Sequence, residues 1–252
     1  MSGHSKWHSI KHKKGKTDAK RGQLFGKLSH RITIAAREGG GNPDANAALA
    51  HEIEAARGYS MPMDNIKRAI AKGTGELSGG SLEQMTFEGY GEGGVAIIVD
   101  VLTDNRNRTT AEVRKVFTRA GARLGETGSV AWMFEKKGVF LVAGTPEHDE
   151  DELLELALEA GADDLRGEGE YLEVVCDVEH FAKVRDSLKE AGIAIESAEL
   201  TKVPKSTVKL DRDSARKVLR LIDTLEDLID VSEVYANFDI PDEVLEEEAA
   251  GA

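Results

Sequence analysis

The residues with the clearest chemical potential are the lysines, histidines and tryptophan near the start of the chain. Five lysines fall within residues 6–16, where they alternate with Trp7, His8 and His12. Lysines bind phosphate oxygens, and an indole ring can stack on an unpaired base, a contact worth about 1–3 kcal/mol. The pattern predicts an extended nucleic-acid-binding arm; the alternative for Trp7 is packing on the folded body. The predicted arm contacts are Lys6, Trp7, His8, Lys11, His12, Lys13, Lys14 and Lys16.

A basic stripe continues the arm onto the first helix that the sequence predicts, from Thr17 to Arg37, before the glycines at 39–41. At 100° per residue the apolar positions of this helix share one arc, and basic side chains project beside it. One side of the helix can then be buried while the next side offers cations to a phosphate backbone. The stripe consists of Lys20, Lys27 and Arg31, with Arg21 as a further predicted contact.

The distribution of charge favours an anionic partner. Residues 1–76 hold 14 basic and 7 acidic side chains, the remaining residues hold 19 basic and 39 acidic ones, and the formal net charge is −13. Clustered cations gain affinity for a phosphate backbone by releasing its counterions, so this segregation indicates nucleic acid. The alternative is a disordered basic tail that only improves solubility.

A second candidate anion contact is the segment 105–109, between a predicted strand and a predicted helix capped by Thr109. Backbone N–H groups and the helix dipole attract anions at such a position, and Arg106 and Arg108 would strengthen the attraction. The alternative is that both arginines are solvated on a loop.

Motifs for catalysis, metals and cofactors are weak or missing. His4, His8 and His12 are four residues apart, but no Cys or carboxylate set accompanies them, so we predict no metal site. The glycines of the run 89–94 precede a strand rather than a helix, and we interpret them as a hairpin turn. No hydrolase, metalloprotease or P-loop pattern occurs, and Cys176 lies in a predicted strand. We therefore expect no enzymatic activity and no cofactor.

The hydrophobic periodicities predict an α+β fold, with a small all-helical N-terminal domain followed by two ferredoxin-like domains, the last nested within the middle one. The expected domains are the basic arm with three helices at 1–76, a middle α+β domain at 82–135 with 205–240, and an inserted acidic domain at 136–204. The expected strands of the middle domain include Val130–Phe134 and Val234–Ile240. A single larger α+β domain is the alternative.

Composition favours a cytoplasmic protein. One cysteine leaves no internal disulfide, and no apolar run approaches the roughly 20 residues of a membrane span. The N-terminus also lacks the apolar region of a secretory signal. We expect no membrane partner and a monomeric chain.

The chain resembles the YebC/PmpR family, which includes the mitochondrial translational activators of cytochrome oxidase. The resemblance rests on the motifs GHSKW at 3–7, KHKK at 11–14, AAREGG at 35–40, SMPMDNIKRAIAKGTG at 60–75, EGYG at 88–91 and NRNRT at 105–109. It covers nearly the whole chain and implies one small helical domain and two α+β domains.

The resemblance implies a regulator of gene expression and leaves its nucleic acid open. Bacterial members are described as DNA-binding transcriptional regulators, while mitochondrial and some bacterial members resemble ribosome-associated factors that help difficult sequences through translation. A flexible arm with one aromatic residue suits partly single-stranded RNA. We therefore favour a translation factor whose partners are ribosomal RNA or mRNA, and ribosomal proteins on the ribosome. A transcriptional regulator of promoter DNA is the alternative, since the three helices could form a helix-turn-helix variant.

Overall fold

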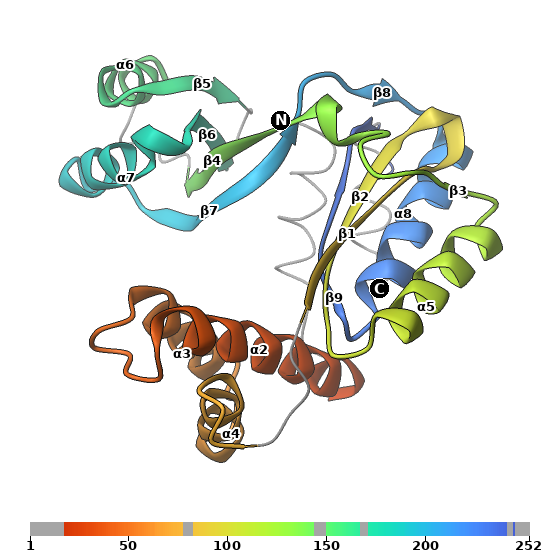
Figure 1. Cartoon of the computed structure of the whole chain (residues 1–252). Helices are drawn as coiled ribbons and strands as arrows, with labels where there is room; N and C mark the ends of the chain where they lie inside the picture. The colour runs from red at the N-terminus through yellow and green to blue at the C-terminus, as the bar shows by residue number, and fades with distance from the viewer. Residues whose placement is uncertain (1–17, 78–82, 144–149, 167–170, 241–243, 245–252) are drawn as a thin grey trace.

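The computed structural model describes residues 18–77, 83–143, 150–166, 171–240 and 244 (Figure 1). A helical unit comes first, a four-stranded sheet follows, and a second four-stranded sheet is inserted before the last strand of the first. Each of these three units surrounds its own cluster of buried apolar side chains.

The helical unit is held together by facing apolar stripes. Its helices are α2 (Asp18–Gly39), α3 (Ala47–Gly58) and α4 (Met63–Gly73). Leu28 and Ile32 of α2 are buried against Leu49 of α3. Asn46 caps α3, because its side chain accepts a hydrogen bond from the backbone amide of Leu49 at 3.0 Å. The Asn46 amide also donates to the Ala35 carbonyl at 2.7 Å, so one side chain fixes α2 against α3.

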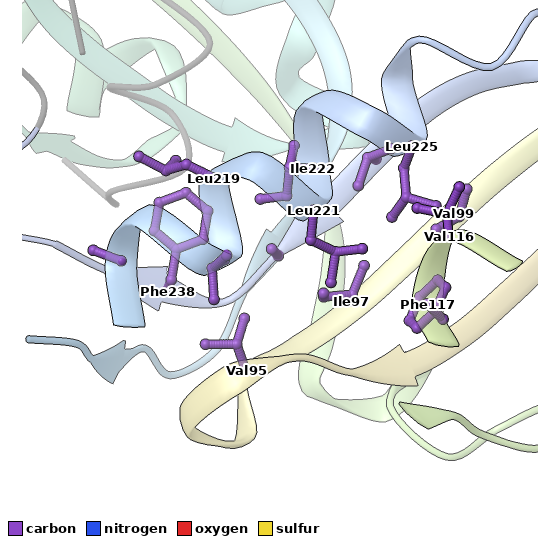
Figure 2. Close-up of a cluster of buried hydrophobic side chains, with 14 of the residues drawn as sticks. Val95, Ile97, Val99, Val116, Phe117, Leu219, Leu221, Ile222, Leu225 and Phe238 are labelled. Carbon is purple, nitrogen blue, oxygen red and sulfur yellow. The ribbon is translucent and has the colours of Figure 1, made fainter. Parts of the chain in front are cut away.

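The middle unit is an antiparallel sheet with the strand order β3-β1-β2-β9. Its strands are β1 (Glu83–Tyr90), β2 (Ala96–Thr103), β3 (Arg123–Leu124) and β9 (Val231–Ala236). Two helices, α5 (Arg106–Arg119) and α8 (Arg212–Glu226), lie side by side on one face of the sheet (Figure 1). Figure 2 shows the core beneath them, where Ile97 and Val99 of β2 lie near Phe117 of α5 and Leu221 of α8. Burying side chains of this size stabilises the fold by about 1.5–3 kcal/mol each.

The inserted unit has the strand order β5-β6-β4-β7. Its strands are β4 (Phe134–Ala143), β5 (Ala162–Arg166), β6 (Tyr171–Asp177) and β7 (Ile195–Pro204), and its helices are α6 (Glu150–Ala160) and α7 (Phe181–Glu190). The rings of Phe140 and Phe181 stack with centroids 4.7 Å apart. Cys176 is buried in β6, as predicted, and burial raises the pKa of its thiol, so the reactive thiolate is disfavoured.

Both sheets follow the ferredoxin-like arrangement. In the inserted unit the chain order β-α-β-β-α-β places the first strand, β4, between β6 and β7. In the middle unit β2, α5, β3, α8 and β9 occupy the equivalent places, and β1 fills the remaining position. The predicted fold class, a helical domain followed by two ferredoxin-like units of which the last is nested in the middle one, is confirmed.

The prediction of a strand at Val130–Phe134 is wrong. Residues 131–133 form a short 3-10 helix, and β3 takes the fourth place in the sheet. The cause is Glu88, whose buried carboxylate accepts hydrogen bonds from the amides of Gly128, Val130 and Ala131 at 2.7–2.8 Å. Burial would raise the pKa of Glu88, but these three hydrogen bonds outweigh burial and lower it.

The predicted strand Val234–Ile240 is broken in two. Strand β9 ends at Ala236, and β10 (Phe238–Asp239) pairs in parallel with β8 (Val208–Lys209). Asn237 makes the break, because its side chain accepts from the Ala96 amide at 2.7 Å and donates to the Ser206 carbonyl at 3.2 Å.

The glycine hairpin predicted for the run 89–94 is confirmed. Strands β1 and β2 pair in antiparallel register on either side of it. Gly93 and Gly94 have φ of 68° and 80°, a backbone region that glycine enters without steric cost.

Candidate nucleic-acid interface

The structure describes only the helical end of the predicted interface. The arm contacts at residues 6–16 lie outside the described residues. Lys20 and Arg21 lie in the first turn of α2, and Lys27 and Arg31 stand one turn apart, about two and three turns after Lys20. The described part of the candidate interface therefore begins with α2.

Lys27 and Arg31 both contact the middle unit. The Nζ of Lys27 donates a hydrogen bond, at 2.5 Å, to the backbone carbonyl of Glu226, the last residue of α8. Cations are favoured at such a position, because the last carbonyls of a helix have no intrahelical partner and carry the negative end of its dipole. The Arg31 guanidinium forms an ion pair with Glu233 on β9, and the Arg31 side chain remains 43% exposed. Lys27 and Arg31 thus fasten α2 to the middle unit, and Arg31 remains within reach of solvent.

Neighbouring residues of α2 extend this contact. A side chain at Gly26 would place its Cβ 3.4 Å from the Cγ2 of Ile229, so the backbone of α2 comes close to the α8–β9 connection. His30 lies half-buried one turn further along. Burial lowers the pKa of His30, an effect that Asp230 opposes and Lys72 reinforces. The lowered pKa favours the neutral form of His30, which adds little positive charge beside Lys27 and Arg31.

Asp230 is a buried anchor beside this contact, with only 3% of its surface exposed. Its carboxylate accepts hydrogen bonds from the hydroxyls of Thr109 at 2.6 Å and Thr103 at 3.1 Å, and from the Arg108 guanidinium at 2.7 Å. Burial would raise the pKa of Asp230, but the hydrogen bonds from Arg108, Thr109 and Thr103 outweigh burial and lower it. The hydrogen bond to Asp230 in turn raises the pKa of Arg108.

Both arginines of the second predicted anion contact have carboxylate partners. Arg106 lies 3.5 Å from Glu83, and Arg108 pairs with Asp104 at 3.0 Å as well as with Asp230. A phosphate at this helix end would have to displace these partners.

The start of α5 also differs from the prediction. The helix begins at Arg106 and is capped by Asn105, whose side chain accepts from the Arg108 amide at 3.1 Å. The predicted cap at Thr109 is wrong, because the Thr109 hydroxyl is buried against Asp230 one turn inside the helix.

The partners of Lys27 and Arg31 could not be predicted from the sequence. Lys27 and Glu226 are 199 residues apart, and Arg31 and Glu233 are 202 apart, so no local pattern connects them. Lys27 also binds a backbone carbonyl, which no residue type marks in the sequence.

Helix α4 presents a further basic surface. Residues 59–62 connect it to α3, and the exposed side of α4 carries Lys67 and Arg68. The Arg68 guanidinium donates to the Asn65 side chain at 3.2 Å. This surface offers more groups for phosphate oxygens than for base edges.

The described residues contain no metal-ligand cluster: three or more His, Cys, Asp or Glu side chains do not come together among them in a way that could hold an ion. None of the helices in the described ranges is both long and apolar enough to span a membrane.

Comparison with known proteins identifies the family. The N-terminal domain of TACO1/YebC proteins matches residues 5–76, and the second and third domains of these proteins match residues 82–238. The chain belongs to the TACO1/YebC family. The resemblance predicted from the sequence motifs is therefore confirmed.

Relatives of this family match along nearly the full chain. A protein of Rubrobacter xylanophilus, named "Probable transcriptional regulatory protein", is 56% identical over 99% of this chain and 100% of its own length. A protein of Dictyoglomus turgidum with the same name is 54% identical over 98% of this chain and 99% of its own length. The crystal structure of a conserved hypothetical protein from Aquifex aeolicus is 47% identical, with a TM-score of 0.77, and the match covers 90% of this chain and 93% of that one. The named relatives carry names of regulators and not of enzymes.

Proposed function

We propose that this chain is a non-catalytic, nucleic-acid-binding regulator of gene expression of the YebC type, acting in the cytoplasm as a ribosome- or RNA-associated translation factor. The observation that carries the proposal is the arm, with five lysines and Trp7 within residues 6–16 of a chain whose net charge is −13. A protein of net negative charge repels phosphate except where cations gather, so the arm orients the encounter. A single copy of the chain presents this arm and needs no partner subunit to do so.

RNA is favoured over DNA because the described helices offer backbone contacts more than base readout. The exposed side of α4 provides Lys67 and Arg68, with Asn65 held by Arg68. Reading duplex DNA requires side chains that reach base edges in the major groove. Trp7 suits unpaired bases, which ribosomal RNA and mRNA expose.

A DNA-binding transcriptional regulator is the second candidate. The names of the relatives favour it. The short connection between α3 and α4 also suits a helix-turn-helix variant, in which α4 would lie in the major groove with Lys67 and Arg68 at its exposed side.

Crosslinking in cells, followed by sequencing of both RNA and DNA, separates the two candidates. The translation-factor proposal expects enrichment of ribosomal RNA or mRNA with the full chain. Enrichment at promoter DNA without RNA would replace it with the transcriptional regulator. Recovery of neither nucleic acid above background would contradict both.

The α2 stripe gives a prediction of its own, since nucleic acid must compete with Glu233 for Arg31. Glu233→Gln removes the charge that pairs with Arg31 and keeps the size of the side chain. Exposed ion pairs are worth about 0.2–1 kcal/mol, so we expect up to about fivefold tighter binding of single-stranded RNA, measured by fluorescence anisotropy. Glu155→Gln, at an exposed position of α6, is the matched control for net charge. An equal gain in both variants would show that Arg31 does not contact the RNA.

A further inference from the structure

Helix α5 is unusual within the acidic part of the chain. It contains five basic residues and one acidic residue in RNRTTAEVRKVFTR. Its apolar side, with Val113 and Phe117, is buried on the sheet. Arg114, Lys115 and Arg119 are exposed on the other side. The burial of one side therefore fixes these three cations toward solvent.

One further arginine extends this surface. Arg220 is exposed on α8, which packs beside α5 over the same face of the sheet (Figure 1). We call these four residues the α5 surface: Arg114, Lys115, Arg119 and Arg220.

The α5 surface differs from other cations of the middle unit in having no internal counter-charge. Arg106, Arg108 and Lys217 pair with carboxylates at 2.7–3.5 Å. The four members of the α5 surface form no ion pair with any side chain in the described parts of the chain. Lys115 and Arg119 also stand one turn apart, where like charges destabilise a helix. This repulsion weakens the fold slightly, and a polyanion bound across Lys115 and Arg119 would relieve it.

The α5 surface is also on the open side of the sheet. The inserted unit packs on the opposite face, where Lys202 of β7 pairs with Asp100 and lies 4.8 Å from the centre of the Tyr235 ring. Figure 1 shows α5 and α8 on the side turned away from that unit. An extended chain of phosphates can therefore lie along α5 without meeting the acidic inserted unit.

We infer that the α5 surface is a second phosphate-binding surface, which contacts the backbone of the nucleic acid that the arm binds. This inference rests on the proposed function. It adds a contact along the length of α5, where the sequence indicated an anion contact only at the first turn, with Arg106 and Arg108. Because every nucleotide carries the same phosphate, cations that contact only the backbone bind without sequence preference. The arm then captures the nucleic acid, and the α5 surface sets its path over the protein.

The test uses the full chain with Arg114→Gln, Lys115→Gln and Arg119→Gln combined. The probes are single-stranded RNA and duplex DNA of equal length, and the readouts are Kd and its dependence on salt. Losing three phosphate contacts should weaken binding at least about tenfold and make the slope of log K against log salt shallower by about 2–3. The control combines Lys183→Gln, Arg185→Gln and Lys189→Gln on α7, an equal change of charge, and should change Kd less than about twofold.

Each outcome is decisive. A selective loss in the α5 variant on either probe supports the inference, and the probe with the larger loss identifies the nucleic acid. Equal effects of the α5 and α7 variants overturn the inference, while the proposed function stands if arm variants still lose binding. If the unaltered chain binds neither probe, the proposed function fails and the inference fails with it. Unchanged circular dichroism in both variants excludes unfolding as the cause of a loss.

Discussion

Reversing Lys11, Lys13 and Lys14 to glutamate is expected to weaken association with nucleic acid by at least about 100-fold at moderate salt. Each lysine that neutralises a phosphate releases counterions, and each glutamate in its place adds repulsion to a chain that already carries a net charge of −13. Affinity is measured by fluorescence anisotropy with single-stranded RNA and with duplex DNA. Deletion of residues 2–16 should have the same effect.

A matched control separates the arm from net charge. Reversal of Lys183, Arg185 and Lys189 on α7 changes the charge equally in the inserted unit and should cost less than about threefold. The arm variant should unfold like the unaltered chain, since α2 through β9 keep every described contact. The α7 variant loses only the surface contacts of Lys183 with the Glu159 carbonyl and of Arg185 with Asp186, at a cost of at most about 1 kcal/mol each. If the arm variant keeps its affinity for RNA and DNA, the arm is not the binding element.

Asp230→Ala is expected to lower the free energy of unfolding of the middle sheet by about 2–3 kcal/mol. The carboxylate accepts three hydrogen bonds, and its loss leaves the hydroxyls of Thr103 and Thr109 without their shared acceptor in a buried site. Arg108 can still pair with Asp104 and contact solvent. The expected loss of stability is therefore smaller than for a fully buried ion pair that loses one partner. Hydrogen exchange of the β2 and β9 amides measures the stability of the middle unit separately from that of the other two units.

The acidic range provides a second readout of Asp230. Its lowered pKa gives stability that is fully present above the pKa of an unfolded Asp, about 3.9, and is lost as the pH falls through the pKa of the folded state. The advantage of the unaltered chain over Asp230→Asn should therefore shrink below about pH 4. The control is Asp227→Ala, at an exposed position on the same connection. Its free energy of unfolding should stay within about 0.5 kcal/mol of that of the unaltered chain. A pH-independent difference would show that Asp230 is not ionised in the fold.

Local patterns were sufficient where local chemistry decides the structure. Asn46 was predictable as a cap because its side chain serves an amide three residues away. The nested ferredoxin-like units were readable from the order of helices and strands, since that order leaves few ways to pair them. The glycine turn before β2 was readable because its neighbours are both strands.

Prediction failed where residues that are distant in the sequence determine the local structure. The segment 130–134 has a strand-like composition. Its first two backbone amides nevertheless donate to the carboxylate of Glu88, some 40 residues earlier, and this contact favours a turn over a strand. Lys27 and Arg31 follow each other by one turn on α2, as their spacing predicts, but their contacts with Glu226 and Glu233 depend on how two units dock. The α5 surface was hidden for a related reason: which arginines lack a counter-charge is a property of the folded chain.

Salt titration of the full chain is the sharpest test of phosphate binding by the arm. Five lysine contacts predict that log K falls against log salt with a slope of about −4 to −5 on duplex DNA, and about −3.5 on single strands. Contacts from the α5 surface would steepen both slopes. The arm variant with Lys11, Lys13 and Lys14 reversed should lose most of this dependence. A slope near zero for the unaltered chain, or an unchanged slope in the arm variant, would contradict recognition of a phosphate backbone by these lysines.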